Sequence, residues 1–465
     1  MQSQAIQQTN HIKIVPLVAV LMSGAFAAIL NQTLLATALP HIMGDLNLTA
    51  NTAQWLTTVF MLVNGVMIPI TAFLMETFTT RKLFLTAMGL FAVGTLICAV
   101  APNFFMLIVG RIVQASGAGI IMPLMQTILF IVFPIEKRGS AMGLFGLVIS
   151  FAPAIGPTLS GWLVDHFPWR VLFFIILPIV IIDIILAYFI LKNVTKRTFP
   201  ELDMLSVIFS TLGFGGLLYG FSSAGVSGWG NDVVVFSLMI GAISLGMFII
   251  RQFMLKQPML EFRVFKYHIF SISTILGMIT FSSMIGGATI LPIYMQDMHH
   301  FTAFETGLML LPGALLMGLM SPVSGRLFDQ FGAKWLAIIG FTILTVSTFM
   351  LTILTSETSF AYLTVVNAVR MFGMSLVMMP TTTAGLNQLP QQFIPHGSAM
   401  NNTMRQVSGS IGTAILVTIM TGSALDPTTH GIEGAIHGVN MSFVVAGAVS
   451  VVGIVLSFFL KKDKI

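Results

Sequence analysis

The sequence predicts an all-α integral membrane protein made of two similar helical bundles with two extra helices between them. Hydrophobic residues make up 56% of the 465 residues and charged residues only 8%, whereas soluble domains carry about 25% charged residues. Apolar runs long enough to cross a bilayer as helices recur from one end of the chain to the other. A duplicated series of motifs divides these runs into two sets.

Fourteen apolar runs separated by polar breaks define the expected spans. In order they are 14–40, 53–75, 83–101, 104–132, 140–163, 168–191, 204–225, 233–254, 269–296, 305–328, 335–355, 361–386, 397–423 and 440–460. The run from Ile14 is too long for the core of a signal peptide, and little positive charge precedes it. We therefore expect it to remain as the first helix.

Lys and Arg are distributed unevenly over the expected loops. If the N-terminus is cytoplasmic, the cytoplasmic segments hold 17 of the 21 basic residues, the external segments hold only Arg170, and three lie within spans. This asymmetry follows the positive-inside rule, so we expect both termini in the cytoplasm. The net charge of +5 then reflects topology, and no nucleic-acid partner is expected.

Two sets of motifs recur at a nearly constant offset. The run from Pro69 to Lys82 corresponds to Pro322 to Trp335, 253 residues later, and Gly139-Ser140-Ala141-Met142 recurs literally 258 residues later at 397–400. Parallel repeats of this kind are typical of transporters with a substrate site between two halves. We expect an N-terminal six-helix bundle in 1–192, a linker with an inserted helical hairpin in 193–266, and a C-terminal six-helix bundle in 267–465.

The fifth span carries a stripe of small residues. The stripe consists of Gly143, Gly146, Ser150, Pro153, Pro157 and Ser160, spaced by three and four residues on one helical face. It would let another helix approach closely, although an ordinary kinked packing helix has the same pattern. The order A-P-A-I-G-P-T-L-S-G-W resembles the antiporter motif of major facilitator drug exporters, in which this helix lines the contact between the halves. The resemblance assigns to this motif Gly146, Pro153, Gly156, Pro157 and Gly161.

The loops after spans 2 and 10 resemble the helix 2–3 motif of the same family, G-x-L-x-D-x-x-G-R-K. The second copy keeps the glycines and the acid, whereas the first has Glu76 in place of aspartate. A carboxylate at a helix end beside basic residues can form a charged latch that breaks when the halves rock apart. A solvated cytoplasmic turn is the alternative. The candidate latch residues are Glu76, Arg81, Lys82, Gly325, Arg326, Asp329 and Lys334.

Arg111 lies deep in the fourth span. A charge within a span is costly and marks a functional site by default, unless the side chain extends to the interface. Its surroundings resemble the motif R-x-x-Q-G-x-G of the family, which includes Gln114 and is linked to proton transfer. Arg370 occupies a similar place in span 12, whereas Arg405 lies nearer the end of its span, where a side chain can extend to the interface.

The first span reads L-N-Q-T-L-L-A-T-A-L-P. It resembles the first-helix motif of fourteen-helix drug–proton antiporters. The residues L-N-Q-T make it most similar to the lincomycin-resistance-type exporters of Gram-positive bacteria. Asn31 stands where those antiporters usually have aspartate. Asn31, Gln32 and Thr33 can hydrogen-bond a ligand, but Asn31 cannot carry a proton.

Asp183 is the one acid that lies deep in an expected span. Its neighbours on the same helical face are apolar, so it either meets a partner on another helix or remains a neutral, buried acid. The first possibility would make Asp183 a candidate for proton coupling.

The resemblance covers nearly the whole chain and implies the major facilitator fold with 14 transmembrane helices. It implies a proton-coupled multidrug exporter of the bacterial cytoplasmic membrane that acts on small amphipathic substrates and is not an enzyme. The alternatives are a dedicated exporter of one metabolite, lipid precursor or cation, and a membrane sensor without flux. Sodium remains an alternative coupling ion. We expect a monomer surrounded by lipid, without cofactor or metal, and the single Cys98 excludes disulfides within the chain.

Overall fold

The computed structural model describes residues 14–194, 198 and 201–460. Fourteen long helices follow one another in these residues: α2 (Ile14–Leu46), α3 (Ala50–Thr77), α4 (Thr80–Ala99), α5 (Phe104–Val132), α6 (Arg138–His166), α7 (Val171–Ile190), α8 (Met204–Ser227), α9 (Asp232–Met254), α10 (His268–Ile293), α11 (Ala303–Phe331), α12 (Ala333–Met350), α13 (Phe360–Asn387), α14 (Ile394–Gly422) and α15 (Pro427–Ser457). Each corresponds to one expected span. Residues 1–13 and 461–465, with the predicted cytoplasmic termini, lie outside the described residues.

Thirteen of these helices are long and apolar enough to cross a membrane, within the part of the chain that the structure describes. The remaining one, α14, has 29 residues but contains Asn401, Asn402 and Arg405. Its polar side chains, except Thr421 near its end, are buried or half-buried, so α14 has the length of a span and the composition of a helix surrounded by protein. The last helix begins well before its predicted start near 440, and it contains a kink at Gly431.

Polar residues in the short loops explain where several helices begin. The side chains of Thr49, Thr79, Asn103 and Ser359 each accept a hydrogen bond from a backbone N–H in the first turn of the following helix. These N–H groups have no partner within the helix. The breaks between apolar runs are therefore specific helix starts as well as polar connections.

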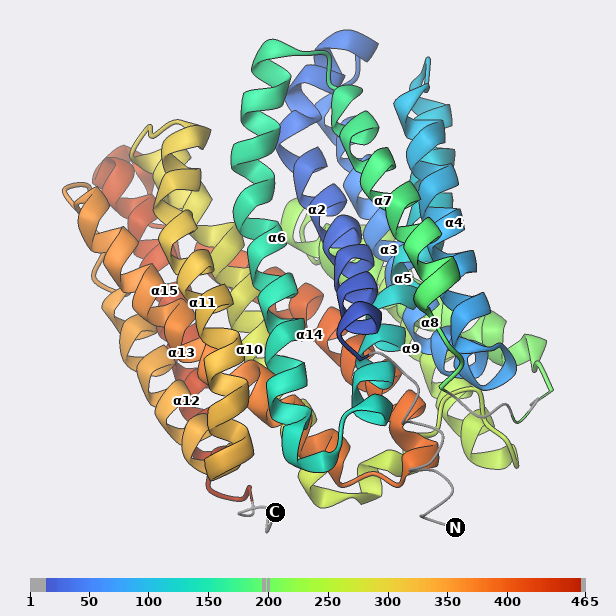
Figure 1. Ribbon diagram of the computed structural model, residues 1–465. Coiled ribbons are helices and arrows are strands. Elements are labelled where there is room, and N and C mark those ends of the chain that lie inside the picture. The colour runs from blue at the N-terminus through green and yellow to red at the C-terminus, as the bar shows by residue number, and fades with distance from the viewer. Residues whose placement is uncertain (1–13, 195–197, 199–200, 461–465) are drawn as a thin grey trace.

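The helices form two groups that meet along two seams. Figure 1 shows α2–α5 and α7 on one side and α11–α13 and α15 on the other. The groups contact each other where α6 packs against α11 and where α14 packs against α3 and α5. The α6–α11 contact includes the first part of the small-residue stripe, at Gly143 and Gly146.

The hairpin α8–α9 is held together by close backbone packing and by one ion pair. A Cβ added at Gly216 of α8 would lie 2.9 Å from Cα of Gly241 in α9. Asp203, at the start of α8, pairs with Arg251 of α9 over 2.5 Å. The hydrogen bond from the Arg251 guanidinium is the main reason why the pKa of Asp203 falls to about 2. Besides α9, α8 packs against α3 of one group and α14 of the other.

Candidate functional site

The seam between α6 and α11 is closed at the end where α6 begins, which the basic residues predict to be cytoplasmic. A Cβ added at Gly143 would lie 2.6 Å from the carbonyl oxygen of Ser321 in α11. One added at Gly146 would lie 3.0 Å from Cβ of Ser321 and 2.7 Å from Cγ of Met379 in the neighbouring α13. Real Cβ atoms do not approach other atoms so closely, so this contact requires glycine at both positions. The stripe is thus an interface between the two halves in its first turns.

Asp329, near the end of α11, bonds to the first turn of α6. Its Oδ1 accepts a hydrogen bond of 2.8 Å from the backbone N–H of Gly139. Its Oδ2 accepts bonds from the backbone N–H and the hydroxyl of Ser140, at 2.8 and 2.5 Å. A helix N-terminus favours negative charge because its free N–H groups point outward. Asp329 therefore links the halves through a charge-assisted cap.

Glu76 makes the corresponding contact on the other seam. Its Oε1 lies 3.1 Å from Nε2 of His396, in the first turn of α14. The other ring nitrogen of His396 accepts a hydrogen bond of 3.3 Å from the backbone N–H of Glu261, so Nε2 is placed to donate to Glu76. Both copies of the duplicated loop motif thus put a carboxylate on the opposite half.

The basic residues predicted as latch partners do not take part in these contacts. The Arg81 guanidinium lies 4.4 Å from the centre of the Tyr188 ring, Lys82 and Arg326 are exposed, and Lys334 is half-buried. None of the four forms an ion pair with another described residue. This part of the prediction is wrong because the carboxylates reach across to N–H groups and a histidine, whereas the adjacent basic side chains leave the helix ends in other directions.

The second motif copy keeps a glycine that its turn requires. Gly332, between α11 and α12, has φ of 75°, a left-handed conformation that glycine adopts without steric cost. The first copy has Thr79 at the corresponding position, with φ of −69° and a side chain that caps α4. The two turns therefore differ in conformation, and this explains why the first copy tolerates the loss of its glycine.

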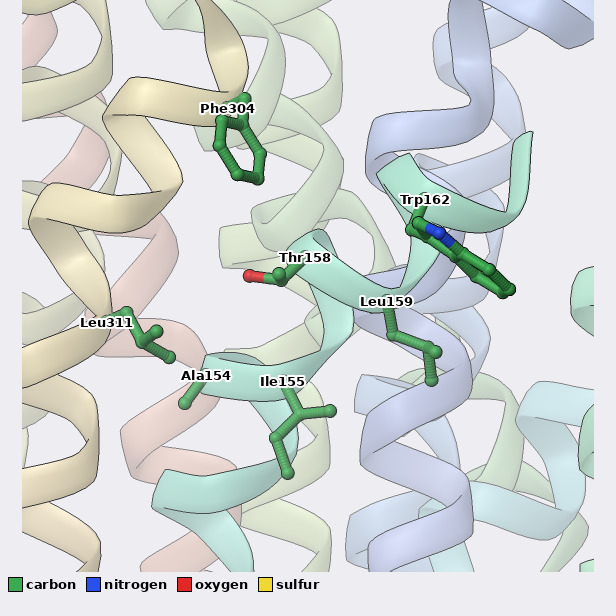
Figure 2. Close-up of a pocket in the computed structure, with 7 residues that line it drawn as sticks. All are labelled: Ala154, Ile155, Thr158, Leu159, Trp162, Phe304 and Leu311. Carbon is green, nitrogen blue, oxygen red and sulfur yellow. The ribbon is translucent and has the colours of Figure 1, made fainter. Parts of the chain in front are cut away.

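The same seam opens toward the other end of the molecule. An open pocket of about 470 Å³, with exposed side chains in its lining, lies between the later turns of α6 and the first turns of α11. Its lining is mostly apolar and consists of Ala154, Ile155, Thr158, Leu159, Trp162, Phe304 and Leu311. Figure 2 shows the Thr158 hydroxyl directed toward α11 and the Trp162 ring directed away from it. One helix pair thus forms both a closed contact and a pocket.

The prediction that Gly156 lies between the halves is wrong for this structure. A Cβ at Gly156 would lie 2.7 Å from Cβ of Thr33 in α2, which belongs to the same bundle. Where α6 leaves α11 it rests on α2, and the Ser160 hydroxyl donates a bond of 2.6 Å to the carbonyl of Leu34. Pro153 is exposed, Pro157 is half-buried, and a Cβ at Gly161 would meet no atom within 4 Å.

Arg111 is the centre of a buried polar network that joins three helices. Its Nη1 donates to the side-chain oxygens of Asn31 and Gln114, at 2.9 and 2.6 Å, and its Nε donates to the carbonyl of Leu56 at 3.1 Å. The guanidinium also lies 4.1 Å from the centre of the Phe60 ring. The structure therefore brings Asn31 of the first span to Arg111 and Gln114 of the fourth, which the separate motifs did not predict, and shows that Arg111 does not extend to the interface.

Gln32 and Thr33, the other two candidates of the first span, lie outside the Arg111 network. Both are half-buried. The Thr33 hydroxyl donates to the carbonyl of Leu30 at 2.9 Å and lies 3.4 Å from the carbonyl of Ala152 in α6. Thr33 thus helps hold α6 on α2.

Asp183 meets a partner on another helix. The Ser23 hydroxyl of α2 donates a hydrogen bond to its Oδ1, and its Oδ2 is buried without a hydrogen-bond partner. A Cβ at Gly24 would lie 2.9 Å from that oxygen. Asp183 therefore belongs to the contact between α2 and α7, separate from Arg111.

Arg370 and Arg405 are buried in the other half. Arg370 donates to the hydroxyl and the carbonyl of Ser283 in α10. Arg405 donates to the Thr382 hydroxyl and, over 3.2 Å, to the carbonyl of Met378 in α13. With 3% of its surface exposed, Arg405 does not extend to the interface, so the alternative based on its position near a helix end is wrong.

Comparisons with known proteins agree with this arrangement of two bundles. Residues 21–413 match the family model described as Major Facilitator Superfamily. The chain belongs to the major facilitator superfamily. It is 58% identical over 449 residues to the uncharacterized transporter YcnB of Bacillus subtilis (strain 168), covering 96% of this chain and 95% of the relative.

Two further matches concern other members of the superfamily. The chain is 42% identical over 464 residues to the lincomycin resistance protein LmrB of Bacillus subtilis, covering 97% of each. The crystal structure of the human organic anion transporter MFSD10 superimposes with a TM-score of 0.70, covering 95% of this chain and 99% of that one, at 14% identity. At that identity the likeness shows the fold alone.

The contacts between the halves of this major facilitator protein that were missed in the sequence include two made by α14. One is His396, although it precedes the repeated Gly-Ser-Ala-Met run as Arg138 precedes the first copy; this position in the repeat could have indicated it. The other is the hydrogen bond of 2.6 Å from Asn402 of α14 to Gln126 of α5. Asn402 and Gln126 are neutral residues on different helices, and no motif in the sequence connects them, so their contact could not be predicted.

Proposed function

We propose that this protein exports small amphipathic compounds, driven by a proton gradient and working by alternating access. The observation that carries the proposal is the contact between α6 and α11. It is closed at Gly139, Gly143 and Gly146, and at its other end the two helices separate and form a pocket. Alternating access requires a contact between the halves that closes on one side of the membrane while the other side is open.

The direction of opening follows from the distribution of basic residues. The closed end holds Asp329 and Glu76, beside the loops rich in Lys and Arg, and the positive-inside rule places these loops in the cytoplasm. The structure then represents an outward-facing state. In the inward-facing state both carboxylate contacts would have to separate.

The choice of drugs as substrates rests on relatives. A protein that is 42% identical over nearly the whole chain is named a lincomycin resistance protein, and the pocket between α6 and α11 has the apolar lining that a lipophilic compound needs. Lincomycin is therefore the first probe. The multi-pass membrane topology fits a location in the bacterial cytoplasmic membrane.

For proton coupling we propose Arg111 as the fixed charge and Asp183 as the carrier. Arg111 stays protonated and cannot itself carry the proton, and Asn31 cannot titrate. Asp183 is the remaining acid that lies away from helix ends, with Glu76 and Asp329 as the next candidates at the ends of α3 and α11.

The proposal is tested in inside-out membrane vesicles from a host that lacks its own drug pumps. Vesicles containing the protein should accumulate radiolabelled lincomycin when the interior is acidified, and vesicles without the protein should not. Collapse of the pH gradient should abolish the accumulation. If accumulation follows a sodium gradient instead, sodium is the coupling ion. If neither lincomycin nor any of a panel of other drugs accumulates, a dedicated exporter or a sensor is favoured.

A further inference from the structure

The interior of the membrane-spanning region carries buried positive charge without a matching negative charge. Arg111, Arg370 and Arg405 are 1–3% exposed. Among the described residues the ion pairs involve other basic groups, namely Arg170, Arg251, Arg263 and His396. The hydrogen-bond partners of the three buried arginines are hydroxyl, amide and carbonyl oxygens, all of them neutral.

Several donor atoms of these arginines have no partner at all. Nη2 of Arg111, Nε and Nη1 of Arg370, and Nε of Arg405 are buried and make no hydrogen bond. The amide of Asn367, one helical turn before Arg370 on α13, also has both polar atoms buried and unpaired. Buried N–H donors without an acceptor are costly. Four guanidinium nitrogens and one amide are thus ready to donate to a further acceptor.

Asp183, the carboxylate buried in the middle of a described membrane helix, does not neutralise this charge. Asp183 contacts Ser23 of α2, whereas Arg111 contacts Asn31 of the same helix. Ser23 and Asn31 are eight positions apart, which corresponds to about 12 Å along a helix axis. The other two arginines lie in the opposite half, on α13 and α14.

We infer that the substrate of this transporter is an amphipathic organic anion. Each guanidinium keeps its charge, and a charge taken out of water needs an opposite charge or a polar ligand to compensate the loss of hydration. In a medium of low dielectric constant an excess of positive charge attracts an anion and repels a cation. The inference rests on the proposed export function and names its substrate class.

The apolar part of such a substrate matches the pocket on the α6–α11 seam. Leu311 lines this pocket, and Gly313, two residues further along α11, faces the unpaired amide of Asn367, because a Cβ there would lie 2.9 Å from its Nδ2. Asn367 in turn precedes Arg370 by one turn. Apolar surface and unpaired donors therefore lie at a similar depth, on two sides of α11.

The test compares three probes that share one ring system, with the full-length protein purified in lipid nanodiscs. The probes are pyrenesulfonate, the neutral pyrenesulfonamide and the cation pyrenyltrimethylammonium. We expect pyrenesulfonate to raise the Tm and to bind at least tenfold more tightly than the sulfonamide, and the cation to have no effect. Equal effects of sulfonate and sulfonamide, or a stronger effect of the cation, would overturn the inference.

Variants connect this binding to the unpaired arginines. Arg370→Gln and Arg405→Gln should each weaken pyrenesulfonate binding at least tenfold, and Arg370→Lys should retain part of it. The matched control is Arg251→Gln, because Arg251 is already paired with Asp203; its binding should equal that of the unmutated protein. A variant that elutes as an aggregate is replaced by its lysine counterpart. Unchanged binding in folded Arg370 and Arg405 variants would contradict the inference.

Two further comparisons complete the test. The first distinguishes an inorganic anion from an organic one, and the second distinguishes failure of the anion inference from failure of the proposed export function. If chloride, compared with gluconate, raises the Tm and pyrenesulfonate does not, the arginines hold an inorganic counter-ion and the substrate inference fails. If pyrenesulfonate binds but neither it nor any drug accumulates in vesicles with a pH gradient, the anion site stands and the export function fails. If vesicles accumulate only the cation or neutral drugs, export stands and the anion inference fails.

Discussion

The carboxylate of Asp329 accepts a hydrogen bond of 2.8 Å from the backbone N–H of Gly139, across the boundary between the two halves. The acceptor lies at the end of one helix and the donor, a main-chain N–H, at the start of another. A Cβ added at Gly139 would clash with Oδ1 of Asp329, so a substitution of Gly139 would disturb the packing as well as the hydrogen bond. Changing Asp329 is therefore the direct way to weaken the closed end of the seam.

We expect Asp329→Asn to shift the protein toward the inward-facing state by roughly tenfold to a hundredfold, since hydrogen bonds to a charged group contribute about 1.5–3 kcal/mol. One amide oxygen can replace one carboxylate oxygen, but the amide nitrogen would face an N–H donor. The measurement is the distance between spin labels placed at the start of α6 and at the end of α11. An unchanged distance distribution would show that Asp329 is only a surface cap.

A bulky residue at Gly143 should block closure of the seam. A Cβ there would lie 2.6 Å from a main-chain oxygen of α11, which cannot rotate away, so Gly143→Leu should reduce drug export by roughly tenfold or more. The matched control is Gly89→Leu in α4, where a Cβ would meet no atom within 4 Å. Both proteins are compared at equal amounts in the membrane. Equal export by the two would show that the close contact at Gly143 is not needed for transport.

Replacement of Arg111 should stop export. Arg111→Ala leaves the side-chain oxygens of Asn31 and Gln114 and the carbonyl of Leu56 without their donor, at a cost of about 1–3 kcal/mol for each buried acceptor. Arg111→Lys keeps the charge but cannot reach all three oxygens, so it should retain a fraction of the activity. Drug flux in vesicles measures both variants, and full flux in Arg111→Ala would make the network purely structural.

Asp183→Asn should weaken uphill export more than downhill equilibration. Asparagine can still accept the hydrogen bond from Ser23, so the contact between α2 and α7 should persist, whereas the exchangeable proton is lost. The measurement is drug accumulation against a gradient under an imposed pH difference, compared with efflux down a gradient. If accumulation is complete, Asp183 is a buried neutral acid and Glu76 becomes the next candidate.

The ion pair of the α8–α9 hairpin should make stability depend on pH in the acid range. The pKa of Asp203 is lowered from 3.8 to about 2, chiefly by the hydrogen bond from Arg251. A depressed carboxyl pKa contributes stability that is present above pH 4 and is lost as the pH falls toward 2. The Tm of the unmutated protein should therefore exceed that of Asp203→Asn at pH 7, and this difference should shrink at pH 3. If the difference in Tm is the same at pH 7 and pH 3, the effect comes only from the hydrogen bond by which the Asp203 side chain caps α8.

The fourteen helices could be predicted because each depends on a local property, the length of an apolar run between capped starts. The repeat also placed Glu76 and Asp329 at equivalent positions. Their partners could not be predicted from residue types, because Asp329 binds backbone N–H groups that every residue except proline carries.

Periodicity predicted the face of α6 but not its neighbours. Gly143 and Gly156 both lie in a close contact, yet Gly143 meets α11 and Gly156 meets α2. The reason is that α6 packs on α11 in its first turns and on α2 in its later turns. Similarly, composition showed that Arg405 is costly in a membrane, but only the positions of Thr382 and Met378 on another helix explain why it remains buried.

The hairpin α8–α9 makes the two lateral faces of the molecule unequal. α8 lies against both α3 and α14: the Trp55 ring of α3 stacks on Tyr219 of α8 at 5.5 Å, and Trp229, just after α8, donates to the Thr418 hydroxyl of α14 over 2.6 Å. A compound dissolved in the bilayer meets a covered seam on this side and the α6–α11 pocket on the other. For an exporter whose substrates come from the lipid, the side of α6 that carries the exposed Trp162 would be the side of entry.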